Sequence, residues 1–381
     1  MADAEKARTI ALVNLAWQHR FIDEALRADL NRLFETQQFI MGEPVGRLER
    51  ELAAYCGAEH AVACGSGSDA LYLALVAAGI GAGDEVLTTP YTFFATAGAI
   101  DRAGARPVFC DVEENSYHIN QDRAAALLAE RPGIRAVIPV HLFGACAPFE
   151  RLREACAARG VTLIEDAAQA IGARVAAKPA GSFGAMACYS FFPTKNLGAY
   201  GEAGMVTTND AGLAGQLRML RMHGSRVRYV HERVGINSRM DTMQALVLLH
   251  KLPYLEEWNE RRRGNAALYR ELLAGAPVRL PAAEGEGDRH VFHHFVITCE
   301  RRDRLREYLL AHGVGCEVYY PIPLHLQECF AGLGYKRGDF PVAERLAGAS
   351  LAIPVGPWLE RDEVAAVAGR IGEFYRTASS G

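Results

Sequence analysis

A single lysine occupies a stretch of small and apolar residues near the middle of the chain. The segment SFFPTKNLGAYGEAG, residues 190–204, contains Lys195 and no second cation. An ammonium group in such surroundings is partly desolvated, which favours the neutral amine and makes the lysine a candidate nucleophile. Lysine side chains also extend over apolar loops while keeping their charge in water, so a surface lysine is the alternative.

Two carboxylates stand at the end of an apolar run. The segment VTLIED is typical of a buried strand that ends at Glu165 and Asp166, and open α/β sheets bind ligands at the carboxyl ends of their strands. The alternatives are a helix cap and a Mg²⁺ site. We predict no metal site, because no second acidic cluster accompanies the pair and the adjacent His293 and His294 would point to opposite faces of a strand.

A glycine-rich turn precedes a helical pattern in CGSGSDALYLAL. Backbone amides at the start of a helix bind phosphate, so Gly67 and Ser68 are candidate phosphate ligands, with Ser68 or Asp69 as the N-cap. The spacing of Gly65, Gly67 and Ala70 also fits the dinucleotide fingerprint of NAD enzymes. That fingerprint calls for an acidic residue at the end of the next strand, where this chain has TTP, so an NAD-dependent dehydrogenase and a purely structural turn remain the weaker alternatives.

These residues are distributed along a repeating pattern of strands and helices. Continuous apolar runs alternate with helical patterns, and such runs indicate strands that are covered on both faces, as in a parallel sheet with crossover helices. The expected strands lie near residues 61–64, 85–89, 106–112, 135–140 and 161–166, with further strands at 187–192 and 204–210.

The pattern changes after a long helix that begins near residue 242 and is broken or kinked at Pro253. The segments HHFVITC, RLREYLLAHG and DEVAAVAGRIGEFY then predict a smaller α+β unit. We therefore divide the chain into a large domain, residues 1–245, and a small C-terminal domain, residues 246–381. The arginine run at 261–263 follows acidic residues within this helix, and we expect it on a solvated face.

Composition narrows the class of protein. The chain of 381 residues has a net charge of −4 and no basic tract, which argues against nucleic acid as a partner. Its nine cysteines include no C-x-x-C pair, which indicates reduced thiols. The segment MADAEKARTIALVNLAWQHR lacks the pattern of a secretion signal, and no apolar run reaches the ~18 residues of a membrane span. We expect a cytoplasmic protein without a membrane partner.

A phosphate cradle, a strand-end carboxylate, the aromatic turn TPYTFFAT and a desolvated lysine are together the parts that hold pyridoxal 5′-phosphate (PLP). The carboxylate keeps the pyridine nitrogen protonated, the aromatic ring stacks on the cofactor, and the lysine forms a Schiff base. Each part alone is weak, but their order along one α/β domain is specific.

The chain resembles the DegT/DnrJ/EryC1/StrS sugar aminotransferases. The shared motifs follow one another over residues 65–327 as GSGSDAL, TFFATA, IEDAAQAIGA, SFFPTKNLGAYGEAG, GINSRMDTMQA and YYPIPLHLQ. The resemblance implies an α/β protein with the PLP-dependent transferase fold type I, similar to aspartate aminotransferase, in which a large domain with a mostly parallel sheet precedes a smaller α+β domain. It also implies a homodimer with active sites at the subunit interface.

By the same resemblance, Lys195 would bind the cofactor and move protons, and Asp166 would pair with the pyridine nitrogen. Gln169 would contact the hydroxyl side of the ring, and Phe93 would stack on its opposite face. The cofactor phosphate would be held by Gly67, Ser68 and Ser190, together with Asn237 of the partner subunit.

Two positions distinguish this chain within the family. Ala203 stands in GEAG where glycine is more frequent, and its methyl group is compatible with the turn if the backbone is not left-handed. Dehydratase members carry histidine at the position of Lys195, so this chain is expected to transaminate.

The resemblance implies ping-pong transfer of an amino group from an amino acid, usually L-glutamate, to a keto-sugar nucleotide, with pyridoxamine 5′-phosphate as the intermediate form. We predict amination at C3 of a dTDP- or UDP-linked 3-keto hexose, for a surface polysaccharide or an antibiotic. The alternative is C4 of a 4-keto sugar, and a DNA-binding regulatory protein is more distant. Candidate contacts to the diphosphate and the sugar are Arg226, Arg228, Tyr229, Arg239, Tyr319, Tyr320 and His325.

Overall fold

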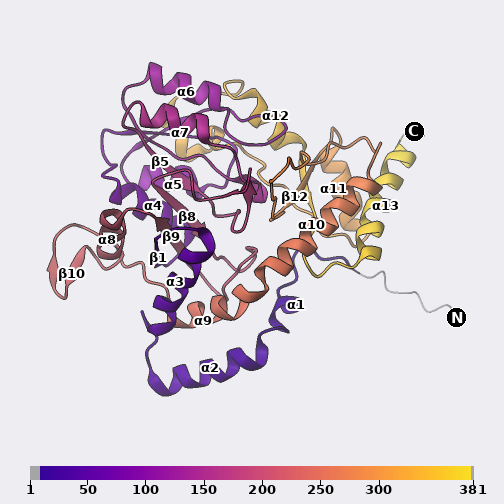
Figure 1. Cartoon of the computed structure of the whole chain (residues 1–381). Coiled ribbons are helices and arrows are strands. Elements are labelled where there is room, and N and C mark those ends of the chain that lie inside the picture. Colours follow the sequence, from indigo (N-terminus) through magenta and orange to yellow (C-terminus); the bar gives the residue numbers. More distant parts are fainter. Residues whose placement is uncertain (1–8, 379–381) are drawn as a thin grey trace.

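The computed structural model describes residues 9–378, and a seven-stranded sheet forms the centre of the larger part of the molecule (Figure 1). The sheet order is β1-β9-β8-β5-β4-β2-β3. The neighbouring strands from β8 to β3 are parallel, whereas β9 runs antiparallel to both β8 and β1. The strands are β1 His60–Cys64, β2 Glu85–Thr88, β3 Arg106–Phe109, β4 Ile134–Val137, β5 Thr162–Asp166, β8 Met186–Ser190 and β9 Gly204–Thr208.

Helices cover both faces of this sheet, as the continuous apolar runs predict. Along β1, Val62 and Cys64 belong to a core with α4 and α8, while the alternate residues Ala61 and Ala63 belong to a core with α3 and α9. Opposite side-chain directions along a strand thus place apolar residues in two separate cores. The helices before and around the sheet are α1 Leu15–His19, α2 Asp23–Thr36, α3 Glu43–Cys56, α4 Gly67–Ala77, α5 Ala95–Arg102, α6 Gln121–Glu130, α7 Glu150–Ala157, α8 Ala211–Leu220 and α9 Thr242–Lys251.

A smaller α+β unit follows. The predicted helix break is confirmed, because a single 3₁₀ turn at Leu252–Tyr254, which contains Pro253, separates α9 from α10. Helix α9 packs on α3, whereas α10 packs on α13. The first residue of α10 belongs to the core of the large sheet and its later residues to the core of the smaller unit, so the core changes within α10. The domain division at residue 245 stays a prediction. The elements are α10 Leu255–Leu272, β12 Phe295–Thr298, α11 Arg302–Ala311, α12 Pro341–Ala349, β13 Ser350–Ile353 and α13 Arg361–Ala378.

Short elements complete the described part. The hairpin of β10 and β11 extends from the body beside α8 (Figure 1). Two more strands form a small antiparallel pair, and three further 3₁₀ turns occur between larger elements. These short elements are β6 Arg174–Val175, β7 Lys178–Pro179, β10 Ser225–Val227, β11 Val230–His231, η1 Leu142–Gly144, η3 Leu324–Leu326 and η4 Glu328–Leu333.

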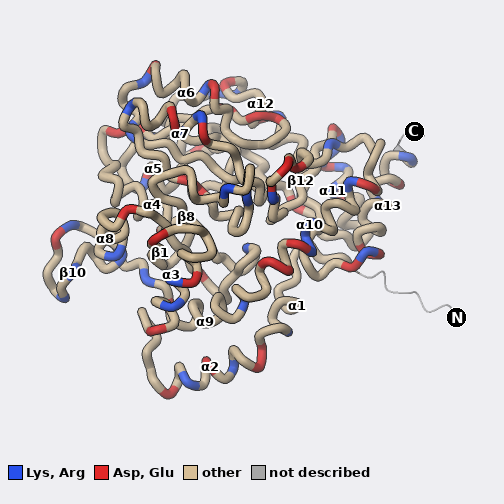
Figure 2. Tube along the Cα trace, viewed as in Figure 1, with Lys and Arg blue, Asp and Glu red and all other residues tan. Residues whose placement is uncertain are grey.

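Charges of both signs are interspersed along the trace in the view of Figure 2. All nine cysteines are free thiols, and Cys329 is the exposed one. Across residues 9–378, no helix is long and apolar enough to cross a membrane. Residues 1–8, which form part of the segment compared with secretion signals, lie outside the described residues.

Candidate active site

One cavity of about 420 Å³ brings together most of the predicted cofactor residues. It lies where the carboxyl ends of β5 and β8 meet the N-terminus of α4, which is the expected position for a ligand in an open α/β sheet. Its size suits a small molecule. The predicted residues that line it are Gly67, Ser68, Phe93, Asp166, Gln169, Ser190, Lys195, Tyr319 and Tyr320.

Asp166 presents a buried carboxylate to this cavity. Its Oδ2 accepts a hydrogen bond from Thr96 Oγ1 at 2.8 Å, and its Oδ1 accepts one from the Ala168 amide at 3.1 Å. Burial raises the pKa of Asp166, while the bonds from Thr96 and Ala168 and the nearby charge of Lys195 oppose that rise. The carboxylate therefore keeps a fixed direction in a site where a positively charged partner is favoured.

The neighbouring carboxylate has a different role because side chains alternate along β5. Glu165 points away from the cavity, where its oxygens accept hydrogen bonds from the amides of Gly181, Phe183 and Gly184. His141 Nε2 lies 2.7 Å from Glu165 Oε2. Glu165 thus anchors the loop before β8, and only Asp166 of the pair is available to a ligand.

Lys195 lies in the loop between β8 and β9, where its backbone amide donates to the Phe192 carbonyl at 2.8 Å. The side chain is partly open to the cavity, but the dense protein around it lowers its pKa to about 8, and the charge of Asp166 limits the decrease. The loop is tight, because a Cβ atom on Gly198 would lie 2.2 Å from the Pro193 carbonyl oxygen. A lysine held in this way supplies a substantial neutral fraction near pH 8.

The start of α4 differs from the prediction in its capping residue. Ser66, with an extended backbone, is the N-cap, and its hydroxyl accepts from the Asp69 amide at 3.1 Å. The prediction of Ser68 or Asp69 is wrong because both are already helical. A Cβ atom on Gly67 would lie 2.6 Å from Ser190 Cβ, so only glycine lets the helix start approach Ser190. The first amides of α4 and the Ser190 hydroxyl therefore form a cradle suited to phosphate.

Aromatic side chains form the opposite part of the cavity. Phe93 is 55% exposed, and its ring centroid lies 6.0 Å from that of Tyr320. Gln169 is fixed on both sides, because its Nε2 donates to Tyr320 Oη at 2.9 Å and its Oε1 accepts from the Phe143 amide at 2.7 Å. Phe93 can therefore pack on a planar ligand, while Gln169 and Tyr320 present ordered polar groups.

The sequence-based view of the histidines is wrong. His293 and His294 both line the cavity, because β12 begins only at Phe295 and the strand alternation does not apply to them. Their ring centroids are 4.0 Å apart. Burial lowers the pKa of each well below its usual value, so both are neutral at physiological pH. Thr96, which binds Asp166, was also missed; its only signal was a position one turn after Phe93.

The remaining predicted residues do not line this cavity. Arg226, Arg228 and Tyr229 lie on the β10–β11 hairpin, where Tyr229 is 79% exposed. Asn237 is exposed and Arg239 half-buried in the segment that follows. The contact of Asn237 with the phosphate site of a second subunit therefore stays a prediction, and so does the contact of the other four residues with a diphosphate.

His325 is also outside the cavity. The 3₁₀ turn that contains it directs its ring into the protein, where Nε2 lies 3.1 Å from Glu344 Oε1 and the ring packs on Phe340. The chain does not bring this side chain to the sugar site that the sequence motif suggested.

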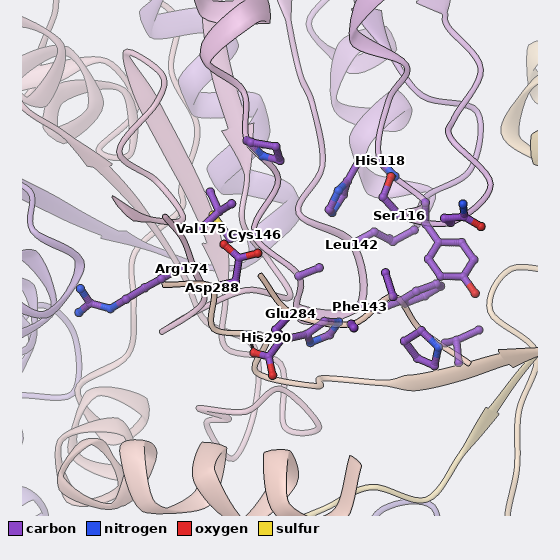
Figure 3. A pocket seen from close by; sticks show the side chains of 18 of the residues that line it. Ser116, His118, Leu142, Phe143, Cys146, Arg174, Val175, Glu284, Asp288 and His290 are labelled. Atoms are coloured by element: carbon purple, nitrogen blue, oxygen red, sulfur yellow. Dashed lines mark hydrogen bonds between the residues drawn. The ribbon is translucent and has the colours of Figure 1, made fainter. Parts of the chain in front are cut away.

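A second cavity, of about 200 Å³, lies between the β3–α6 and β4–α7 connections and the segment that leads into β12 (Figure 3). It shares His294 with the Lys195 cavity. Ser116, His118 and Cys146 line it, but none of the predicted site residues does. Across residues 9–378, no group of three or more metal-ligating side chains is present.

A buried carboxylate, a desolvated lysine and a phosphate cradle around one cavity define the site of a PLP-dependent enzyme of fold type I. The chain belongs to the DegT/DnrJ/EryC1/StrS aminotransferase family, whose model matches residues 20–372. It is therefore a PLP-dependent aminotransferase.

Individual relatives match over nearly their whole length. A pleiotropic regulatory protein of Geobacillus stearothermophilus is 45% identical over 96% of this chain and 99% of its own. UDP-N-acetyl-3-dehydro-alpha-D-glucosamine 3-aminotransferase of Acidithiobacillus ferrooxidans is 42% identical over 94% and 96%. The crystal structure of S. venezuelae DesV in complex with a ketimine intermediate is similar with a TM-score of 0.91, 39% identity, and coverage of 96% and 98%.

The departure at Ala203 is compatible with the fold. Ala203 is fully buried in the segment directly before β9 and does not adopt a left-handed backbone, so the condition set by its methyl group is met.

Proposed function

We propose that this enzyme moves an amino group from an amino acid, L-glutamate in particular, to C3 of a dTDP- or UDP-linked 3-keto hexose. The proposal rests mainly on one observation, which is that Lys195, Asp166 and the phosphate cradle at the start of α4 line the same cavity. The 3-aminotransferase name of the relative from Acidithiobacillus ferrooxidans supports C3 over C4. The Geobacillus relative is named a regulatory protein, but the side chains that line this cavity do not indicate such a role.

In the proposed mechanism, PLP supplies an electron sink that stabilises negative charge on the substrate carbon. Ser190 and the amides of Gly67 and Ser68 bind its phosphate. Asp166, held by Thr96 and Ala168, binds the protonated pyridine nitrogen and keeps the ring electron-poor.

Lys195 acts as general base and general acid. Its Nζ takes the proton from the donor carbon and returns a proton when the keto sugar is aminated, and a pKa of about 8 suits both steps near neutral pH. Phe93 and Gln169 orient the ring, and the neutral His293 and His294 line the cavity beside it. The sugar lies toward Tyr319 and Tyr320.

The enzyme works as a cytoplasmic homodimer in this proposal. The β10–β11 hairpin carries Arg226, Arg228 and Tyr229 away from the cavity of its own chain, so these residues, with Arg239, contact the diphosphate in the other subunit. Asn237 reaches the phosphate of that same site. A cationic, aromatic hairpin is suited to a nucleoside diphosphate.

The test is a panel of reverse half-reactions. Enzyme loaded with PLP is mixed with dTDP- and UDP-linked 3-amino and 4-amino sugars, and the change in cofactor absorbance is recorded. We expect 3-amino sugars to react and 4-amino sugars to be at least tenfold slower. Reaction with 4-amino sugars alone would assign the enzyme to C4, and no reaction with any sugar would contradict the proposed substrate class.

A further inference from the structure

The middle residue of the arginine run 261–263 is buried, contrary to the solvated face that the sequence predicted. Arg262 on α10 is 4% exposed, whereas Arg261 pairs with Glu360 and Arg263 with Glu284 near the surface. Successive helical residues point about 100° apart, so three in a row cannot share one face. Arg262 is directed into the interior near Trp358, whose ring centroid lies 5.9 Å from its guanidinium carbon.

Arg262 lacks a counter-ion. Within residues 9–378, no carboxylate forms an ion pair with it; its Nη1 donates to the Phe292 carbonyl at 3.1 Å, and its Nε has no partner. Burial lowers its pKa to about 10, so the guanidinium is still charged at neutral pH. An unpaired buried charge is costly, so a group of opposite charge is favoured beside it.

A small pocket beside the active site contains this charge. The pocket, of about 30 Å³, is lined by Arg262, Trp358 and Gln18. Its walls include Thr194, Lys195, His293, His294 and Tyr319, all of which also line the larger cavity, so the two spaces adjoin.

The polar groups of the small pocket select an anion. Among residues 9–378, no aspartate or glutamate lines it, and its two histidines are neutral, so Lys195 and Arg262 are its charged groups in this part of the chain. Trp358 Nε1 is a buried donor with no partner in the described part of the chain. The Gln18 amide oxygen also lacks one there, and the amide can turn to present its NH₂ group. The space is far too small for a sugar or a nucleotide but accepts a group of a few atoms.

We propose that Arg262 and the Trp358 N–H bind a carboxylate of the amino-acid donor, whose amino-bearing carbon then lies in the larger cavity beside Lys195. This inference rests on the proposed function, which identifies the amino donor as an amino acid. It assigns the acidic co-substrate to the small pocket and leaves the sugar nucleotide to the larger cavity. Arg262 thereby acts in the amino-acid half-reaction and has no contact with the sugar.

The two half-reactions separate this role from a structural one. The holoenzyme variant Arg262→Met is mixed with L-glutamate and, separately, with a nucleotide amino sugar that carries no carboxylate, and cofactor absorbance is followed. We expect the KM for L-glutamate in its half-reaction to rise about 10- to 100-fold, since one charge-assisted hydrogen-bonding partner is lost. The amino-sugar half-reaction should stay within twofold of wild type.

Arg263→Met is the matched control, because it removes a neighbouring arginine that is already paired with Glu284. Both half-reactions should be unchanged in it. Equal slowing of both half-reactions by Arg262→Met would overturn the proposal. If that variant does not fold, Trp358→Phe removes the N–H donor and keeps an aromatic, smaller side chain. It should raise the KM for L-glutamate a few-fold, and an unchanged KM would contradict the proposal.

A direct binding measurement separates this inference from the proposed function. Calorimetric titration with glutarate, a dicarboxylate without an amino group, uses the holoenzyme and needs no turnover. Glutarate should bind wild type and Arg263→Met alike and bind Arg262→Met at least tenfold more weakly. Equal binding to all three would overturn the carboxylate site, whereas failure of every amino sugar to react would overturn only the sugar assignment.

Discussion

Two desolvated lysines, one in the loop between β8 and β9 and one bonded to it, show what distinguishes a reactive lysine from a structural one. Burial lowers the pKa of both Lys195 and Lys251 to about 8. Lys251 Nζ donates to the Gly198 carbonyl at 2.6 Å and lies 4.5 Å from the centroid of the Tyr200 ring. Lys195 instead borders a cavity that also contains the carboxylate of Asp166.

The difference lies in the partners and not in the pKa. Lys251 is committed to a backbone carbonyl and an aromatic face, so its charge supports the loop that carries Lys195. Lys195 has open space and a carboxylate as its neighbour, which are the conditions for binding a cofactor and moving a proton. A lowered pKa alone would have given both lysines the same role.

The largest expected effect is loss of Lys195. Lys195→Ala should lower the rate of transamination roughly 10³-fold or more, because it removes the general acid and base. Lys251→Met should lower the rate less than about tenfold and instead reduce stability by about 1–3 kcal/mol, since the Gly198 carbonyl loses its donor. Steady-state kinetics and thermal unfolding separate the two outcomes. Comparable losses of activity in both variants would remove the distinction between the lysines.

The next effect concerns the charge that accompanies Lys195. Asp166→Asn should lower kcat by about 10²-fold, because a neutral amide no longer stabilises the protonated pyridine nitrogen. The absorbance spectrum of the holoenzyme should change as well. Glu165→Gln is the matched control on the same strand, and it should act mainly on unfolding temperature. A kcat within twofold of wild type for Asp166→Asn would contradict the assigned role.

The pH dependence of cofactor binding should follow Lys195. Its pKa lies below the usual lysine value, so the neutral amine increases as pH rises through about 8. The rate at which cofactor-free protein combines with PLP should rise about tenfold between pH 7 and pH 9. Lys251→Met should keep this midpoint although Lys251 titrates in the same range. A midpoint above pH 10, or one that disappears in Lys251→Met, would contradict the account.

The smallest effect is expected at Thr96. Thr96→Val keeps the shape of the side chain but removes the hydrogen bond to Asp166 Oδ2. We expect kcat to fall about fivefold, as for one hydrogen bond of about 1 kcal/mol. Thr96→Ser, which keeps the hydroxyl, should restore most of the rate. If the valine variant is fully active, Thr96 does not orient the carboxylate.

Much of this architecture could be predicted from the sequence. Continuous apolar runs predicted the central sheet and its two covered faces, and Pro253 predicted the helix break. The motifs around Lys195 and Asp166 indicated the family. These features depend on local composition and spacing, which a sequence contains directly.

The errors have a common physical cause. The N-cap at Ser66 and the shared direction of His293 and His294 depend on the residue at which an element begins. In a strand, a shift of one residue reverses every side-chain direction. Arg262 depends on packing between α10 and the C-terminal core. The proposed contacts of Arg226 and Asn237 involve a second subunit, which one chain does not contain, and these stay predictions.

The most direct test of the central claim is chemical. The PLP-loaded protein is reduced with borohydride, digested and analysed by peptide mass spectrometry. We predict that the cofactor mass is attached to Lys195 in the peptide that contains PTKNLGAYGEAG, and that Lys251 is unmodified. Attachment at Lys251, or an unlabelled Lys195 in a protein that binds PLP, would contradict the account.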